Sequence, residues 1–184
     1  MSNPIVLNVD DLTEDIPALT SSFARLMQEA IVMCMMPHNH ASGVLCNLQD
    51  LESVLEEVRI DWKTSYSERI RRAFGAPRNA AERAGEGIAI LTILALTEYT
   101  VFERAPIGNG FDFWLSRNDE DDQFPFQYEA GLEAKGLSHA QYPSQIVRAV
   151  NDGIDQIKNS DNADLPAWVL ATEFSRPVIY LVQL

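Results

Sequence analysis

The sequence predicts an α/β protein with a mixed central β-sheet, and three observations lead to this fold class. The second half of the chain alternates helical and extended periodicity. Glycine-containing or polar turns separate the extended stretches. The apolar fraction is 46% and the charged fraction 22%, as in globular proteins that bury a sizeable core. From residue 79 onward the expected elements are a helix over 79–96, strands over 99–104, 111–117 and 126–137, a helix over 138–158, and strands over 168–174 and 178–182.

Each of these elements has a local justification. Asn79 can cap the first helix, and Pro143 gives the second helix an alternative start. Turns are expected at 108–110, where Gly-Asn-Gly occurs, at 118–122, where every residue is polar, and at 175–177. The second helix has one apolar face, formed by Ile146, Val147, Val150, Ile154 and Ile157. The resulting order of elements is α-β-β-β-α-β-β.

The first 78 residues predict an α-rich N-terminal extension (1–78) that packs on a core of residues 79–184. A short strand is expected at 4–9. A helix capped by Thr20 or Ser21 is expected to run to about Met36, because Pro37 follows. A strand at 44–48 and a helix at 51–58, capped by Asp50, come next. The last element of this part is a basic helix at 66–74.

The chain is strongly acidic, with 27 acidic and 14 basic side chains and a formal net charge of −13. Such a charge opposes non-specific attachment to DNA or to an anionic membrane, although a local basic face can still bind nucleic acid. The longest apolar stretch, residues 88–96, is too short to span a bilayer, and the acidic N-terminus lacks the pattern of a secretory signal. Two cysteines do not make a disulfide framework. We therefore expect a cytoplasmic protein with no membrane partner.

The candidate catalytic site consists of Asp112, Glu133 and Lys135, on two successive expected strands. Alternate residues of a strand share a face, so Asp112 lies with Trp114, and Glu133 lies with Lys135. If the strands pair, two carboxylates and one ammonium converge. Two carboxylates can hold a hard cation such as Mg²⁺, and a neighbouring ammonium can orient a water or stabilise a phosphate. The alternatives are a solvated strand face and an ion pair between Asp112 and Lys135.

This order of elements, carrying these residues, resembles the PD-(D/E)XK nuclease superfamily, and more narrowly an uncharacterised bacterial branch with a restriction-endonuclease-like core. The resemblance covers residues 79–184. The usual motif has an acid on the first helix, an aspartate on the second strand and Glu-x-Lys on the third. Asp112 matches the aspartate, and Glu133-Ala134-Lys135 matches Glu-x-Lys. Glu82 and Glu86 both match the helical acid, and Glu129 is a competing acid on the third strand.

The resemblance implies a metal-dependent phosphodiesterase acting on nucleic acid, or an inactive descendant of one. In that site Mg²⁺ or Mn²⁺ would be held by Asp112, by Glu133, and by Glu82 or Glu86. Lys135 would position the attacking water or stabilise developing charge.

Two kinds of partner are expected from the charge distribution. Arg69, Arg71 and Arg72 form a basic cluster that could contact a phosphate backbone. The net charge of −13 instead favours a non-catalytic interaction protein that binds a basic protein surface. An immunity protein, an antitoxin-like partner or a phage-defence subunit would have this character.

One short stretch also contains residue types that bind zinc, namely Cys34, His38, His40 and Cys46. Their spacing matches no recognised zinc finger, and Cys34 also fits the apolar face of the helix expected to end near Met36. The sequence therefore favours a structural role for Cys34.

Overall fold

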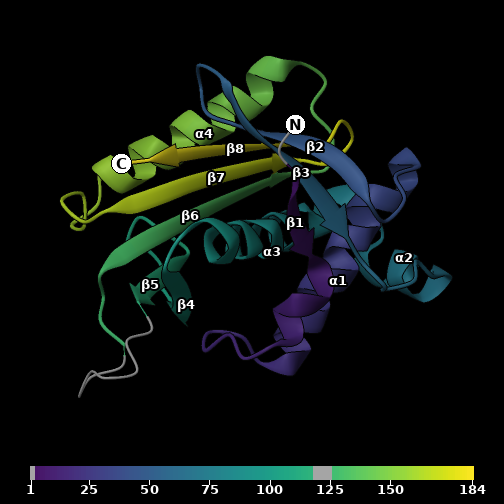
Figure 1. The fold of residues 1–184 in the computed structure, drawn as a ribbon, viewed down its shortest axis with the longest axis horizontal. Coiled ribbons are helices and arrows are strands. Elements are labelled where there is room, and N and C mark those ends of the chain that lie inside the picture. Colours follow the sequence, from purple (N-terminus) through teal and green to yellow (C-terminus); the bar gives the residue numbers. More distant parts are fainter. Residues whose placement is uncertain (1–2, 118–125) are drawn as a thin grey trace.

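The computed structural model describes residues 3–117 and 126–184 and forms one eight-stranded mixed sheet with helices on both faces (Figure 1). The strand order is β1-β3-β2-β8-β7-β6-β5-β4. The strands are β1 (Ile5–Asn8), β2 (Val44–Gln49), β3 (Val54–Asp61), β4 (Tyr99–Arg104), β5 (Phe113–Arg117), β6 (Ala130–Leu137), β7 (Ala167–Glu173) and β8 (Val178–Gln183). The expected α/β class with a mixed sheet is confirmed.

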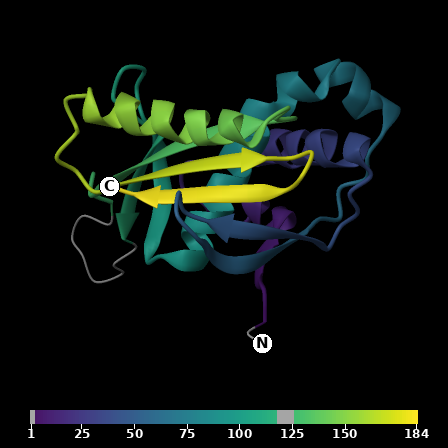
Figure 2. The ribbon, with the colours of Figure 1, turned by 90° about the horizontal axis from the view of Figure 1, so that it is seen from above.

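The helices divide between the two faces of the sheet. They are α1 (Ser21–Met35), α2 (Glu68–Phe74), α3 (Pro77–Leu96) and α4 (Pro143–Lys158). On one face α1 and α3 enclose a core that includes Phe113, Leu132 and Leu170. On the other face α4 packs over Trp114 and Val169 and runs alongside β7 and β8 (Figure 2). In strands β5, β6 and β7, odd and even positions therefore face different helices.

The second half of the chain has the expected order of elements. Strands β4, β5 and β6 form an antiparallel meander, α4 crosses over, β7 pairs parallel to β6, and β8 returns antiparallel to β7. Two strands are shorter than expected, because β5 begins at Phe113 and β6 at Ala130. Phe111 precedes the ladder, and its ring lies against Gly131. The turn expected at 118–122 lies outside the described residues.

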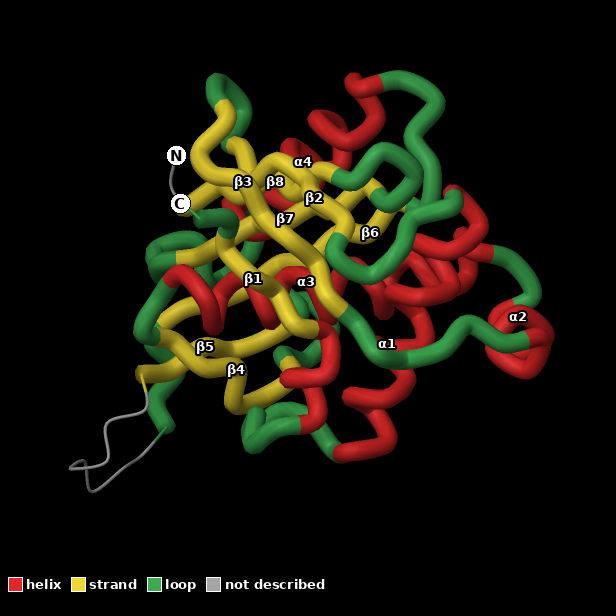
Figure 3. Tube along the Cα trace, turned by 45° about the vertical axis from the view of Figure 1, so that its right-hand side comes forward, coloured by secondary structure: helices red, strands yellow, loops and turns green. Residues whose placement is uncertain are grey.

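The N-terminal residues join the same sheet rather than forming a separate one. Strand β2 pairs parallel to β8, and β3 lies between β2 and β1 (Figure 3). The expected helix at 51–58 is wrong, since this segment enters the β2–β3 hairpin. Asp50 makes cap-like hydrogen bonds without a helix. Its carboxylate accepts from the backbone of Glu52 and Ser53 and closes the hairpin turn.

Apolar and polar side chains alternate in the second half of β3, as expected for a strand with one buried face. Val58 and Ile60 are fully buried, whereas Arg59 between them is not. Pairing with β1 on one side and β2 on the other satisfies the backbone of this strand.

Among the described residues, no helix combines the length and the apolar character needed to cross a membrane.

Candidate functional site

Asp112, directly before β5, lies within electrostatic reach of Glu133 on β6. The β5–β6 ladder begins with Phe113 opposite Leu132, and Asp112 directly precedes it. The Asp112 backbone N–H donates to the carbonyl of Leu132 at 2.9 Å. The Asp112 side chain in turn accepts a hydrogen bond from the backbone of Ala134 through Oδ2 at 2.9 Å. These bonds hold Asp112 beside Leu132 and Ala134, and its negative charge acts on Glu133, which lies between those two residues in the strand.

Glu133 is a buried carboxylate on the α4 face of the sheet. Its neighbours Leu132 and Ala134 belong to the core on the α3 face, so Glu133 points the other way, toward Gly153 of α4. The residue is 1% exposed, and among the described residues its Oε2 has no hydrogen-bond partner. Burial, followed by the negative charge of Asp112, raises the pKa of Glu133 to about 7, although Lys135 and Gln156 act to lower it.

Lys135 forms an ion pair with Glu133, not with Asp112. Its Nζ donates to Glu133 Oε1 and also to the side-chain oxygen of Gln156 at 3.3 Å. The Lys135 side chain keeps 29% of its surface exposed, so the ammonium lies between the buried carboxylate and solvent. Gln156 was not expected here, because a single exposed amide on α4 carries no pattern in the sequence. Only the packing of α4 on β6 brings it to Lys135.

Glu86, one of the two candidate helical acids, belongs to a different cluster. It is fully buried and accepts hydrogen bonds from Arg83 at 2.6 Å and from Arg104 at 2.9 Å. The Arg104 guanidinium also lies over the ring of Phe113, on the α3 side of the sheet. Burial raises the pKa of Glu86 despite both arginines. The sheet thus separates Glu86 from the side chains of Glu133 and Lys135.

Glu82, the other candidate helical acid, is a surface residue. Its side chain is 72% exposed and pairs with Arg83 at 3.0 Å. Burial lowers the pKa of Arg83, but the negative charges of Glu86, Glu82 and Asp112 raise it overall. Arg83 therefore links Glu82 electrostatically to Asp112. In the described part of the chain, no three or more His, Cys, Asp or Glu side chains are gathered closely enough to hold a metal ion.

The backbone beside this site is packed unusually closely. A Cβ on Gly136 of β6 would lie 1.8 Å from the carbonyl oxygen of Ala81, and one on Gly85 would lie 2.7 Å from the Gly136 backbone. These two glycines allow α3 to cross β6 directly after Lys135. The helix therefore fixes the position of the strand that carries Glu133 and Lys135.

The basic cluster Arg69, Arg71 and Arg72 is exposed on α2, which packs on α1 and α3. Arg71 pairs with Glu68 at 2.9 Å, and Arg72 donates to the backbone of the same residue. Helix α2 lies at one end of the molecule and strands β4 and β5 at the other (Figures 1 and 3). A nucleic acid in contact with both the arginines and Asp112 would have to extend along the molecule.

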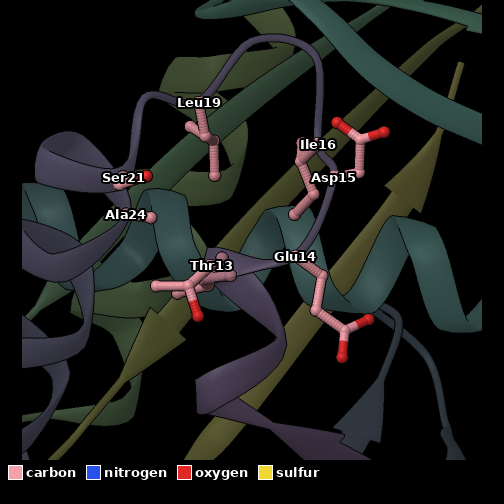
Figure 4. Close-up of a pocket in the computed structure, with 8 residues that line it drawn as sticks. Thr13, Glu14, Asp15, Ile16, Leu19, Ser21 and Ala24 are labelled. Carbon is pink, nitrogen blue, oxygen red and sulfur yellow. The ribbon is translucent and has the colours of Figure 1, made fainter.

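The other sequence candidate and the surface depressions contribute little to this site. Cys34 and Cys46 are buried, and burial raises the pKa of both thiols to about 12, so neither is a ready zinc ligand. A depression of ≈ 290 Å³ lies where the segment after β1 meets the start of α1 (Figure 4). Its acids Glu14 and Asp15 point away from one another, so they form no common site.

Comparisons with protein families, with curated proteins and with solved structures found no match for this chain. The geometry of its own residues is therefore what bears on its function.

Proposed function

We propose that the chain is a metal-dependent phosphodiesterase-like domain of the PD-(D/E)XK type, with Asp112, Glu133 and Lys135 as its site. One observation carries the proposal: the buried carboxylate of Glu133 keeps an unpartnered oxygen beside a second carboxylate, that of Asp112. An unpaired buried carboxylate oxygen is costly, so natural proteins keep one mainly where a ligand can use it.

The donor set fits a small hard cation. Asp112 uses Oδ2 for the backbone of Ala134, and Glu133 uses Oε1 for Lys135, which leaves one oxygen of each carboxylate. Mg²⁺ commonly binds through one or two carboxylates and fills its remaining positions with water and substrate phosphate. Such an ion would neutralise charge on a phosphodiester and activate water.

Lys135 is placed to serve the substrate side of this site. Its ammonium lies at the boundary between the buried Glu133 and solvent, where a phosphate oxygen or an attacking water could approach. The restriction-endonuclease-like topology is part of the same proposal, and the order β4-β5-β6-α4-β7-β8 supports it. Glu86 is not included among the metal ligands, because Arg83 and Arg104 already occupy its carboxylate.

The test is cleavage of plasmid, single-stranded DNA and RNA in the presence of Mg²⁺ or Mn²⁺. Lys135→Ala and the double variant Asp112→Asn/Glu133→Gln should each lose activity by roughly 100-fold or more. Asp152→Asn removes a surface acid from α4 and is the matched control, which should cleave like the wild type. An absence of cleavage on all three substrates, together with no metal binding in calorimetry, would refute the active enzyme.

A second candidate is a non-catalytic interaction protein on the same fold. The closed ion pair between Lys135 and Glu133 favours it, as does the net charge of −13. An acidic surface would attract a basic protein partner and would do so less strongly at high salt. This candidate gains if the cleavage assay is negative while Lys135→Ala lowers stability and Glu133→Gln restores it.

A further inference from the structure

The three histidines of the chain lie close together, with His38 near both His40 and His139. His38 and His40 follow α1, and His139 lies between β6 and α4. The ring centroids of His38 and His139 are 6.1 Å apart, and those of His38 and His40 are 6.4 Å apart. Between His38 and His40, Asn39 adopts a left-handed conformation with φ of 62°, which turns the chain so that both rings approach.

Hydrogen bonds to backbone carbonyls fix the proton position on two of these rings. His38 Nε2 lies 3.1 Å from the carbonyl oxygen of Ser138, and His40 Nε2 lies 3.0 Å from that of Ser175. A carbonyl oxygen only accepts, so each Nε2 carries the proton. In the neutral ring, Nδ1 of His38 and Nδ1 of His40 are then left with free lone pairs.

The third ring is oriented by a carboxylate through a hydroxyl group. Ser175 Oγ donates to Glu173 Oε1 at 2.5 Å, so it accepts from His139 Nδ1 at 2.9 Å. Glu173 is 2% exposed and also accepts from the backbone of Ala140, Ser175 and Arg176. The proton of His139 is therefore held on Nδ1, and its Nε2 keeps a lone pair.

We propose that His38, His40 and His139 form a binding site for one transition-metal ion of the Zn²⁺ class. Imidazole ligands of metals characteristically donate their other N–H to a carbonyl or a carboxylate; His38 and His40 do so directly, and His139 reaches the carboxylate of Glu173 through the Ser175 hydroxyl. His38 and His139 line a surface depression of ≈ 510 Å³ together with Gln141, Ser175 and Arg176, so an ion can enter from solvent.

The separations of His38 from His40 and from His139 can be compared with those that a bound ion requires. With a Zn–N distance of about 2.1 Å, a ring centroid lies about 3.2 Å from the metal, so two rings at the tetrahedral angle have centroids about 5.2 Å apart. The observed 6.1 and 6.4 Å exceed this by about 1 Å. In the described residues the three rings are not gathered closely enough to hold an ion, so the proposal requires side-chain rotations that bring them together.

A cation is favoured over an anion as the occupant. Arg176 is the only residue of permanent positive charge among those that line the depression, and its guanidinium donates to the carbonyl of Ala140 at 2.7 Å. The buried carboxylate of Glu173 accepts from the backbone N–H of the same arginine, so this loop also carries a negative charge. Cys34 and Cys46, which lie near His38 and His40 in the sequence, are buried in the core and are not part of this site.

The test is calorimetric titration of the untagged chain with Zn²⁺, accompanied by the absorption spectrum of the Co²⁺ form. We expect one ion per chain, and His38→Asn, His40→Asn and His139→Asn should each raise Kd at least about tenfold. Ser175→Ala, which frees His139 Nδ1, should raise Kd roughly 10- to 100-fold. His139 is exposed, so its variant should fold, and circular dichroism checks each protein.

Two controls separate this site from the other features of the molecule. Gln141→Ala changes a residue of the same depression that has no imidazole and should leave the Zn²⁺ affinity unchanged. Asp112→Asn/Glu133→Gln removes the carboxylates of the proposed phosphodiesterase site and should also bind Zn²⁺ normally. Equal affinity in all three histidine variants, loss of Zn²⁺ binding in the carboxylate variant, or binding of inorganic phosphate without binding of Zn²⁺ would each overturn the proposal.

Discussion

Replacing Glu133 with glutamine should change how the stability of the protein depends on pH. The Glu133 side chain is 1% exposed, and its pKa is raised from 4.5 to about 7, first by burial and then by the charge of Asp112. Glutamine has nearly the same shape and is uncharged at every pH. Glu133→Gln therefore removes the cost of a buried negative charge and keeps most of the packing against Gly153.

The sign and size of the effect follow from proton binding. Between pH 4.5 and 7 the folded protein holds a proton on Glu133 that the unfolded chain has released. This bound proton contributes to the free energy of unfolding. The contribution is fully present below pH 4.5 and is lost as the pH rises through about 7. A pKa difference of about 2.5 corresponds to about 3 kcal/mol. Because the isoelectric point is ≈ 4.5, measurements should start at about pH 5.5, which leaves about 2 kcal/mol to be lost by pH 8.

The assay is urea unfolding of the wild type and Glu133→Gln at several pH values between about 5.5 and 8. Taking the difference between the two proteins cancels the other titrating groups. We expect the variant to gain about 2 kcal/mol relative to the wild type across this range. Thr172→Val changes an uncharged buried side chain and should differ from the wild type by a constant amount. A constant difference for Glu133→Gln as well would refute the reasoning.

Three further predictions concern neighbouring features. Lys135→Ala should destabilise the protein by about 3 kcal/mol at pH 8 and by less at pH 5.5, where Glu133 holds a proton, and adding Glu133→Gln should restore most of the loss in thermal melts. Gly136→Ala should cost at least about 3 kcal/mol in urea unfolding, since its Cβ would collide with a carbonyl of α3, whereas Gly108→Ala, at φ +97° with open space around it, should cost only about 1 kcal/mol. A thiol reagent at pH 8 should label neither buried cysteine until urea is added; rapid labelling of the native protein would contradict their burial.

The second half of the fold could be predicted from the sequence because its signals are local. Helix α3 and strand β4 lie within two residues of their expected ends, and α4 begins at the alternative start, Pro143. The helix predicted at 51–58 was wrong for a physical reason. Asp50 is equally suited to cap a helix and to close a hairpin turn, and only pairing with β1 and β2 decides between them.

The candidate site was partly predictable as well. Alternation along β6 correctly placed Glu133 and Lys135 on one face, and their spacing of two residues could have indicated that they pair with each other. The nearness of Asp112 to Glu133 depends on the pairing of β5 with β6, which no local pattern specifies. The pairing of Glu86 with Arg104 could not be predicted either, because Arg104 comes from β4 and meets α3 only in the folded chain.

The separation of Glu86 from Glu133 by the sheet does not by itself argue against the active enzyme. Mg²⁺ rarely needs a complete cage of protein oxygens, and two carboxylates with water and a substrate phosphate are sufficient. The contact that matters more is the ion pair between Lys135 and Glu133, because it occupies an oxygen that faces the site. A bound cation would compete with the ammonium for this carboxylate, and the released Lys135 would then be free to contact a phosphate. If the chain is catalytic, Mg²⁺ should therefore change the environment of the Lys135 ammonium, which can be followed by NMR of the labelled side chain. An ammonium signal that is unaffected by saturating Mg²⁺ would favour the closed pair and the interaction protein.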